Sequence, residues 1–447
     1  MYRANVFSRP VRPGRRPGPA AAPGRERKAL GGLSRLRPAA IRKGNQKLVK
    51  SINRNIVLNI VRQHGPISRA DAARMSQLYP ATVSSIVNDL IAEGFVREVG
   101  LGDSTGGRQP VMLELNRGVY AACGASIEVG RVRVCLTDLD ARVLARVEGP
   151  LVSQEGPRRN LPAIASAIRE IIGAGQVPPE KVLGVGVVYP GPVDTATGTI
   201  QASPHMPGWG GFSLKTALES EIDYEVMVDN DANAAAWGEK WFGAAKGYSS
   251  FLYVMADYGL GGGIVIDDRL YRGRNDGAGE IGHMTVDVDG PQCKCGNFGC
   301  LDVMASGTAI ARKMISDIKR GAKTLCSELA GGDIEAVTMD TVLEAAAAGD
   351  PHARAIVEES GRYVGIGLAN LVNCFNPELI VLGGQLALRS NLFFASARET
   401  ARRRAWPVLG KDLGIVVSAL GHDACVIGAA SLALTRVFES PSISAYA

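Results

Sequence analysis

The chain has 447 residues, of which 46% are hydrophobic, and a formal net charge of +6. Such a length supplies about three domains with substantial cores. The sequence has no apolar run of about eighteen residues and no apolar signal segment near its start, so a membrane span and export are not predicted and a cytoplasmic location is expected. The charge is uneven, because residues 1–50 hold 14 Lys or Arg against Glu26, a net charge of +13, and the remainder carries −7.

Residues 1–50 are rich in Pro, Gly and Arg and have little to bury. This composition predicts a basic disordered tail. Such a tail would attract DNA phosphates regardless of base sequence. A solvated extension and a mis-assigned start codon are the alternative interpretations.

Residues 51–116 have the pattern of a winged helix-turn-helix DNA-binding domain. A helix is predicted over 51–64 and stops at Gly65-Pro66, a second begins at Ser68, and a third spans 80–93. Two short strands, FVREVG and VMLELN, follow and are joined by a glycine-rich loop. Three helices followed by a hairpin are typical of a winged helix, in which the third helix enters the major groove.

The apolar face of the third helix leaves small polar residues elsewhere on its surface, and these suit hydrogen bonds to base edges. They are Thr82, Ser84, Ser85 and Asn88. Arg108 lies near the tip of the glycine-rich loop, where it suits a narrow, electronegative minor groove. The alternative is a three-helix module that binds protein.

Four metal-ligand residues lie within eighteen positions: His283, Cys293, Cys295 and Cys300. Three thiolates and one imidazole are typical of a closed, tetrahedral structural zinc site. The other five cysteines are scattered singly, which favours reduced thiols over a disulfide framework. Free cysteines in a loop are the alternative.

From residue 119 onward, strand-like runs such as VLGVGVVYP alternate with helical stretches such as LPAIASAIREII, which predicts α/β layers. His283 lies ten residues before CKCGNFGC and Glu280 lies three residues before that His, a spacing that resembles the ROK family of sugar kinases and sugar-responsive repressors. The resemblance covers residues 119–435. The segment RADAARMSQLYPATVSSIVNDLIAEGFVRE also resembles the DNA-binding half of ROK repressors, with Tyr79 where many relatives have a capping Ser.

The resemblance implies a two-lobed, actin-like body of the ribonuclease H-like type over residues 117–447, with a sugar cleft between the lobes and a zinc loop at 283–300. It implies that Asp231 matches the catalytic base of the family, although a cap of the following helix is an alternative role for an Asp at this position. The sugar-binding residues that it implies are Asn230, Asp231, Glu280, His283, His205 and Asp302. His205 stands where Asn is usual and Asp302 where Glu is usual, which bears on sugar preference.

The two phosphate turns of the family's kinases are altered. The pattern GIDIGGT becomes GASIEVG at 124–130, and GTGIGGG becomes DYGLGGG at 257–263. The first turn loses its acid and its Gly-Thr pair, and the second gains the carboxylate of Asp257 and the phenol of Tyr258. An anionic side chain repels ATP phosphates, so we predict a chain that is not an enzyme, in which Asp231 is a vestigial base.

These features together predict a sugar-responsive DNA-binding transcriptional regulator, a repressor of carbohydrate metabolism with zinc as its cofactor. Its partners would be double-stranded operator DNA and a sugar or sugar phosphate effector, and it would be a homodimer or homotetramer. Closure of the cleft on the sugar would move the winged helices relative to one another. The alternative is an ATP-dependent ROK sugar kinase with an appended DNA-binding domain. A structural zinc protein that binds neither sugar nor DNA would leave Asn230, Asp231 and Glu280 unexplained.

Overall fold

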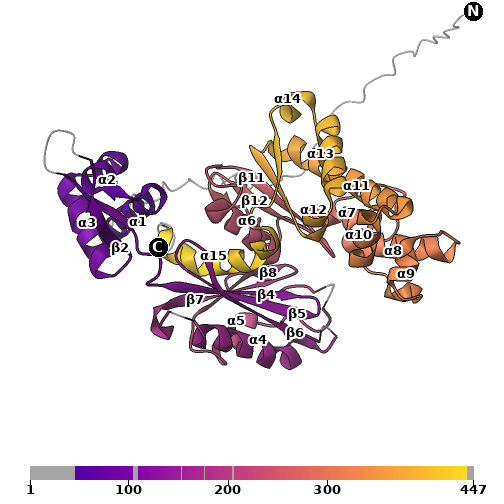
Figure 1. The fold of residues 1–447 in the computed structure, drawn as a ribbon, viewed down its shortest axis with the longest axis horizontal. Coiled ribbons are helices and arrows are strands. Elements are labelled where there is room, and N and C mark those ends of the chain that lie inside the picture. Colours follow the sequence, from indigo (N-terminus) through magenta and orange to yellow (C-terminus); the bar gives the residue numbers. More distant parts are fainter. Residues whose placement is uncertain (1–45, 104–108, 153, 176, 204–205, 440–447) are drawn as a thin grey trace, which may run out of the picture. The chain divides into compact units, whose positions relative to one another are not determined.

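The computed structural model describes residues 46–103, 109–152, 154–175, 177–203 and 206–439 (Figure 1). The chain divides into two units, Met1–Gln46 and Lys47–Ala447. Nearly all of the predicted basic tail, with Arg108 and His205, lies outside the described residues. Within the described ranges, no helix is long and apolar enough to cross a membrane.

The first described part has the predicted order of three helices and a hairpin, with one additional short strand. Its elements are α1 (Gln46–His64), β1 (Ile67–Ser68), α2 (Arg69–Ser76), α3 (Pro80–Ala92), β2 (Val96–Leu101) and β3 (Val111–Leu115). The strands form an antiparallel sheet in the order β1-β3-β2. The apolar faces of α1, α2 and α3 pack with this sheet into one core that includes Leu58, Val87 and Leu113.

Local signals explain where these helices begin. Ser68 caps α2 by accepting a hydrogen bond from the Asp71 amide at 3.1 Å, and its hydroxyl donates to the Asp71 carboxylate at 2.7 Å. Pro80 occupies the first turn of α3, where its missing N–H costs nothing, and Tyr79 makes no side-chain cap. Helix α1 begins at Gln46, five residues before the predicted start, because the helical pattern continues into the end of the basic segment.

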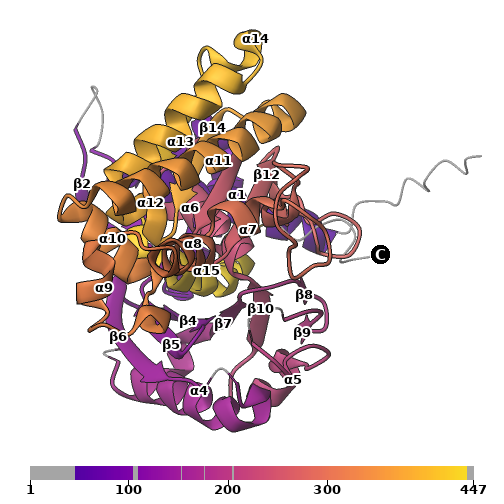
Figure 2. The ribbon, with the colours of Figure 1, turned by 90° about the vertical axis from the view of Figure 1, so that its right-hand side faces the viewer.

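The first lobe of the body contains a five-stranded sheet in the order β10-β7-β4-β5-β6. Helices α4 and α5 lie along one side of this sheet (Figure 2). The elements of the lobe are β4 (Ala121–Glu128), β5 (Arg131–Thr137), β6 (Val143–Pro150), α4 (Gly156–Gly173), η1 (Pro179–Lys181), β7 (Val182–Tyr189), β8 (Val193–Asp194), β9 (Thr199–Ile200), α5 (Leu214–Glu219) and β10 (Val226–Asn230). Helix α6 (Asp231–Phe242) follows β10 and packs mainly on the sheet of the second lobe.

The second lobe contains another five-stranded sheet, in the order β13-β12-β11-β14-β15. Its strands and short turns are β11 (Phe251–Ala256), β12 (Leu260–Ile266), β13 (Arg269–Leu270), η2 (Ile281–His283), β14 (Leu379–Gly383), β15 (Gly414–Val417), η3 (Ile334–Ala336) and η4 (Gly421–Asp423). Its helices are α7 (Leu301–Ala305), α8 (Gly307–Lys319), α9 (Leu325–Leu329), α10 (Met339–Ala347), α11 (Pro351–Phe375), α12 (Gln385–Arg389), α13 (Asn391–Arg404) and α14 (Pro407–Gly410), and α15 (Ala424–Phe438) follows them in the chain.

The two sheets share one topology. In each, the first three strands pair antiparallel, and the fourth and fifth strands add in parallel beyond the first strand. This repeated arrangement confirms the predicted two-lobed, ribonuclease H-like body.

Helix α15 returns to the first lobe and covers the side of its sheet opposite α4 (Figure 1). Helix α15 lies so close to strand β7 and helix α6 that there is no room for a side chain at two glycines. A Cβ on Gly186 of β7 would lie 1.8 Å from the Ala429 carbonyl oxygen, and one on Gly428 would lie 2.2 Å from that of Ala234 in α6. Helices α6 and α15 therefore touch backbone to backbone, so a displacement of one requires a displacement of the other.

Candidate functional site

The four predicted metal ligands come together in the structure. Their donor atoms all lie within 4.8 Å of one another. His283 Nδ1 and Cys293 Sγ are 3.7 Å apart, and Cys295 Sγ and Cys300 Sγ are also 3.7 Å apart. A turn closed by the Gly296 amide on the Cys293 carbonyl at 2.9 Å curls the loop, and Cys300 immediately precedes helix α7.

This donor set fits zinc. Bonds of about 2.3 Å to sulfur and about 2.0 Å to nitrogen give a tetrahedron whose edges are about 3.5 to 3.8 Å. The two 3.7 Å separations match those edges. Three thiolates favour a soft or borderline ion over magnesium or calcium, which prefer oxygen ligands.

A cavity of about 1030 Å³ lies beside this cluster and is lined by residues of both lobes. One end of it, here called the carboxylate end, is formed by Asp231, Glu280, His283 and Asp302. The first belongs to α6, and the others come from the segment around η2 and from α7. The fold therefore brings together four residues that are up to 71 positions apart in the sequence.

The two adjacent side chains at the start of α6, Asn230 and Asp231, have different roles. Asn230 is the cap: its side-chain oxygen accepts from the amides of Ala232 and Asn233, both at 3.0 Å, and its amide donates to the Gly191 carbonyl at 3.1 Å. The Asn230 side chain is therefore engaged before any ligand binds. The Asp231 carboxylate accepts from the amide of its neighbour Ala232 at 2.8 Å and lines the cavity.

The electrostatics of this end favour neutral carboxyl groups. Burial raises the pKa of Asp231 to about 7; the Ala232 amide opposes this shift, whereas the charges of Glu280 and Asp257 add to it. Burial also raises the pKa of Glu280, against the influence of His283. One oxygen of Asp302 already accepts from the Leu260 amide at 3.0 Å, which fixes the orientation of that carboxylate.

Asn233 follows Asn230 and Asp231 just after a strand, but it is not among the sugar-binding residues predicted from the sequence. Its side chain is 2% exposed, lines the cavity, and has a carbonyl oxygen without a hydrogen-bond partner among the described residues. A buried, unpaired amide oxygen is costly, and a hydroxyl of a bound molecule would satisfy it. The only sequence signal was its place one turn into the helix that begins at Asp231.

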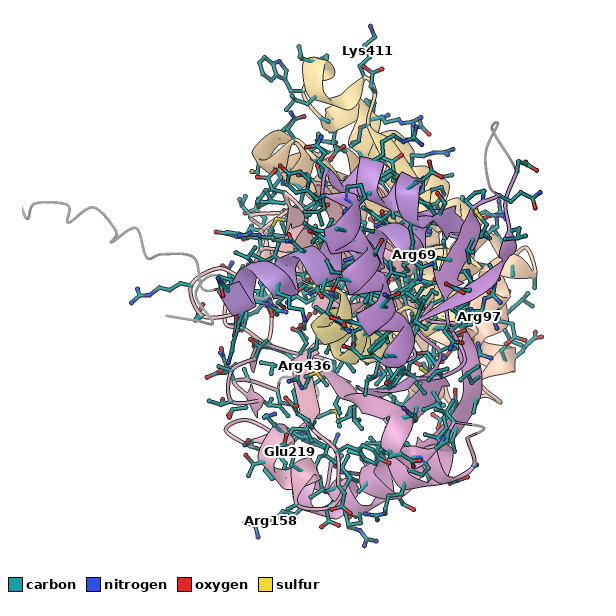
Figure 3. All side chains as sticks on the ribbon, turned by 90° about the vertical axis from the view of Figure 1, so that its left-hand side faces the viewer. Arg69, Arg97, Arg158, Glu219, Lys411 and Arg436 are labelled. Carbon is teal, nitrogen blue, oxygen red and sulfur yellow. The ribbon has the colours of Figure 1, made fainter. Side chains whose placement is uncertain are left out.

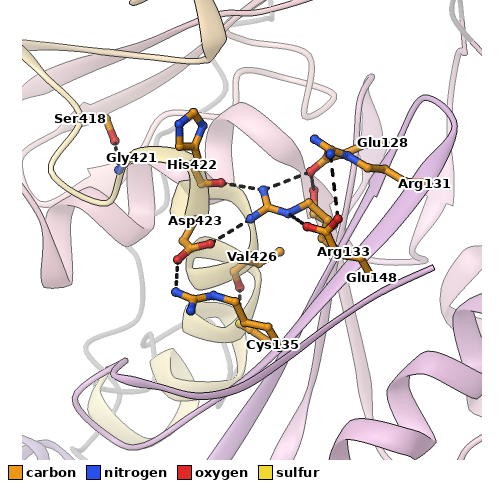
Figure 4. A network of polar contacts seen from close by, with 12 residues as sticks. Glu128, Arg131, Arg133, Cys135, Glu148, Ser418, Gly421, His422, Asp423 and Val426 are labelled. Carbon is orange, nitrogen blue, oxygen red and sulfur yellow. Dashed lines mark hydrogen bonds and ion pairs between the residues drawn. The ribbon is translucent and has the colours of Figure 1, made fainter. Parts of the chain in front are cut away.

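Another part of the cavity lining, here called the arginine end, contains the two altered turns. Glu128 pairs with Arg131 at 2.7 Å, and Arg133 pairs with Asp423 at 2.9 Å (Figure 4). Asp257 accepts from the Gln385 amide at 3.0 Å, so it holds the first residue of α12. Asp257, which stands where the family's kinases have glycine, therefore helps to fix the start of α12.

In the part formed by α1, α2, α3 and the β2-β3 hairpin, the residues predicted to read bases lie along α3. Ser85 and Asn88 are exposed, whereas Thr82 and Ser84 are half-buried. Arg69 at the start of α2 (Figure 3) donates to the Asn88 side chain at 3.2 Å and pairs with Glu98 at 2.8 Å. The Asn88 amide is therefore held in one orientation by a residue outside α3.

Similar proteins cover most of the chain. A family model described as "ROK family" matches residues 124–436. A putative xylose repressor of Caldicellulosiruptor sp. (strain Rt8B.4) is 34% identical over 89% of this chain and 99% of its own length. The DNA-binding transcriptional dual regulator NagC of Escherichia coli (strain K12) is 33% identical over 86% of this chain and 92% of its own length.

Solved structures agree with the architecture. The crystal structure of a ROK family transcriptional regulator, a homologue of the E. coli MLC protein, superposes with a TM-score of 0.75 at 28% identity and covers 88% of this chain and 98% of its own. A ROK family glucokinase from Streptomyces griseus, in complex with glucose and AMPPNP, superposes with a TM-score of 0.63 at 30% identity, covering 70% of this chain and 98% of its own. The fold, the matched segment and the identity to these relatives establish that this chain belongs to the ROK family.

Proposed function

We propose that this protein is a sugar-responsive transcriptional repressor that binds operator DNA through residues 51–116 and an effector sugar in the cleft of residues 117–447. The observation that carries the proposal is the meeting of Asp231, Glu280 and His283 at one end of a cavity in a chain that also has a winged-helix part. Carboxylates and an imidazole are the groups that recognise sugar hydroxyls. Relatives named as repressors, including those named for xylose and N-acetylglucosamine, support this assignment.

Zinc would be the ion of the Cys3His cluster. Its role would be to fix the loop 283–300, because His283 both belongs to the cluster and lines the cavity. When bound, zinc would supply a rigid tetrahedral anchor for this loop and no chemistry on the effector. Loss of the ion would leave the imidazole free to turn and so would weaken effector binding.

We infer that the chain does not phosphorylate sugars. The Glu128 carboxylate and the half-exposed phenol of Tyr258 line the arginine end, and the three arginines there are paired with carboxylates. Nothing in this arrangement favours a triphosphate. A coupled assay with common hexoses should show no turnover near the ordinary kinase rate of about 1 per second.

A continuous set of contacts supports a route from the cleft to the DNA-binding part. Asp231 begins α6, and Trp241 near the end of α6 lies under the Arg62 guanidinium of α1, 4.4 Å from its carbon to the ring centre. Arg62 also lies 4.9 Å from the ring of Phe438 in α15, and Asn59 of α1 donates to the Phe438 carbonyl at 2.7 Å. Helix α1 thus contacts the ends of both α6 and α15.

We infer that effector binding at Asp231 shifts α6 and α15 together, and that Arg62 transmits the shift to the winged helix. Burial lowers the pKa of Arg62 to about 10, which still leaves it charged at neutral pH, so the aromatic contact persists in the cell. In a homodimer or homotetramer, this movement would change the spacing of the two recognition helices. That spacing sets operator affinity.

The experiment for this proposal is fluorescence anisotropy of the full-length protein on labelled DNA from upstream of its own and neighbouring genes, with and without a panel of sugars. One fragment should bind tightly at moderate salt, and one sugar should shift its affinity by about five-fold or more. Binding of equal strength to operator and scrambled DNA, unaffected by every sugar, would refute the proposal.

A further inference from the structure

The cavity is larger than one sugar ring requires. Its volume of about 1030 Å³ equals the upper end of the range of about 300 to 1,000 Å³ that accommodates drug-sized ligands. A monosaccharide held by Asp231, Glu280 and His283 would fill the carboxylate end alone. The arginine end would then have no occupant under the proposed function.

The charge of the cavity disfavours a ligand that carries a phosphate group. Seven carboxylates line it: Glu128, Asp231, Asp257, Asp276, Glu280, Asp302 and Asp340. Four cationic side chains line it: Arg131, Arg133, Lys294 and Arg389. Even with Asp231 and Glu280 neutral, the other five carboxylates outnumber the four cations, and this excess of negative charge disfavours a phosphate.

The arginines do not offset this excess, because carboxylates already hold them. Arg131 contacts Glu128 at 2.7 Å, and Arg133 contacts Glu148 at 3.0 Å and Asp423 at 2.9 Å (Figure 4). Arg389 is paired with Asp340. A phosphate would have to break such pairs to gain a cation, so these pairs give no net attraction for an anion.

The remaining groups at this end suit an uncharged polyol. Tyr258 is 44% exposed, and its hydroxyl donates to Asp340 at 3.1 Å, which leaves part of the ring open as an apolar surface. The side chains of Gln385 and His422 lie 3.0 Å apart and both line the cavity. An aromatic surface beside amide, imidazole and carboxylate groups matches the alternating apolar and hydroxyl faces of a pyranose.

We propose that the arginine end is a second sugar subsite, and that the effector is an uncharged saccharide of at least two linked rings. This proposal rests on the proposed function, because the first ring would occupy the carboxylate end. Asn233 and Asp231 would hold the first ring, and Tyr258, Gln385 and His422 would contact the second. The subsite is distinct from the zinc cluster, which borders only the first ring.

The test is isothermal titration calorimetry on the full-length, zinc-loaded protein. The probes are xylose, glucose and N-acetylglucosamine, the β-linked disaccharide of each, and glucose 6-phosphate. At least one disaccharide should bind tenfold or more tightly than its monosaccharide, and glucose 6-phosphate should bind more weakly than glucose. Tyr258→Ala and, separately, His422→Ala should bring the affinities of the disaccharide and monosaccharide together.

Tyr248→Ala is the matched control, since Tyr248 is 37% exposed and does not line the cavity. It should keep the difference between disaccharide and monosaccharide. Circular dichroism melting shows whether each variant is folded. Equal affinities for one and two rings in the wild type, or tighter binding of the phosphate, would overturn the second subsite while leaving the sugar-responsive function intact. Failure of every saccharide to bind would contradict both proposals.

Discussion

Asp231→Asn measures how much the charged form of the Asp231 carboxylate destabilises the folded protein. The substitution keeps the shape of the side chain and removes its charge. Burial raises the pKa of Asp231 from 3.8 to about 7. Because the folded chain binds this proton more tightly than the unfolded chain does, the group favours folding fully below about pH 4, and this contribution is lost as the pH rises through about 7.

The expected change in the free energy of unfolding follows from the size of the pKa shift of Asp231. About three pKa units at about 1.4 kcal/mol each give on the order of 4 kcal/mol, lost between acidic and mildly alkaline pH. The side chain faces the water of the cleft and is only half-buried, so screening makes this an upper value. Asp231→Asn should therefore raise stability above about pH 7 and have little effect near pH 4.

Thermal melting of wild type and Asp231→Asn from about pH 5 to pH 8 measures the effect. The melting temperature of the wild type should fall relative to that of the variant as the pH rises. Asp412→Asn, which alters an exposed carboxylate, is the control and should follow the wild type. Parallel pH profiles for wild type and Asp231→Asn would refute the assignment of a raised pKa to this carboxyl group.

Three further outcomes are expected. Cys295→Ser should reduce bound zinc from about one ion per chain to nearly none, as measured by elemental mass spectrometry, and should weaken effector binding. Full retention of zinc would contradict the Cys3His assignment. Arg62→Ala should reduce the sugar-induced change in operator affinity, typically worth about 1 to 3 kcal/mol, and should have a smaller effect on the affinity for either ligand alone. If anisotropy shows an unchanged response of operator affinity to the sugar, Arg62 does not connect the cleft to the DNA-binding part. Gly428→Ala, whose new methyl would meet the Ala234 carbonyl, should lower the free energy of unfolding by roughly 1 to 3 kcal/mol, and a melting temperature equal to that of the wild type would show that α6 and α15 can separate freely.

Features encoded by short segments could be predicted from the sequence. The Cys3His cluster lies within eighteen positions, its ligand types predict a metal site, and the structure brings its four donor atoms to within 4.8 Å of one another. The helices of the winged part were predicted because capping residues and proline mark their starts at Ser68 and Pro80. Strand β1 was missed, because its two residues are too few to show an alternating pattern.

Features that depend on distant contacts could not be predicted. Asn230 and Asp231 are equally good caps by type, and only the fold shows that Asn230 takes the role. Arg133 meets Asp423 across 290 positions and Arg62 meets Trp241 across 179 positions, and no local periodicity reveals either contact. Asn233 looks like any helical residue until its burial and its unpaired oxygen are known.

Thermodynamic reciprocity provides the most direct test of coupling between the cleft and the winged helix. The affinity of the full-length protein for its effector is measured by calorimetry, first alone and then saturated with operator DNA, and operator affinity is measured with and without saturating effector. If the two sites are coupled in one molecule, operator must weaken effector binding by the same factor by which effector weakens operator binding. An effector affinity unaffected by operator would contradict a repressor in which the sugar cleft controls the DNA-binding part.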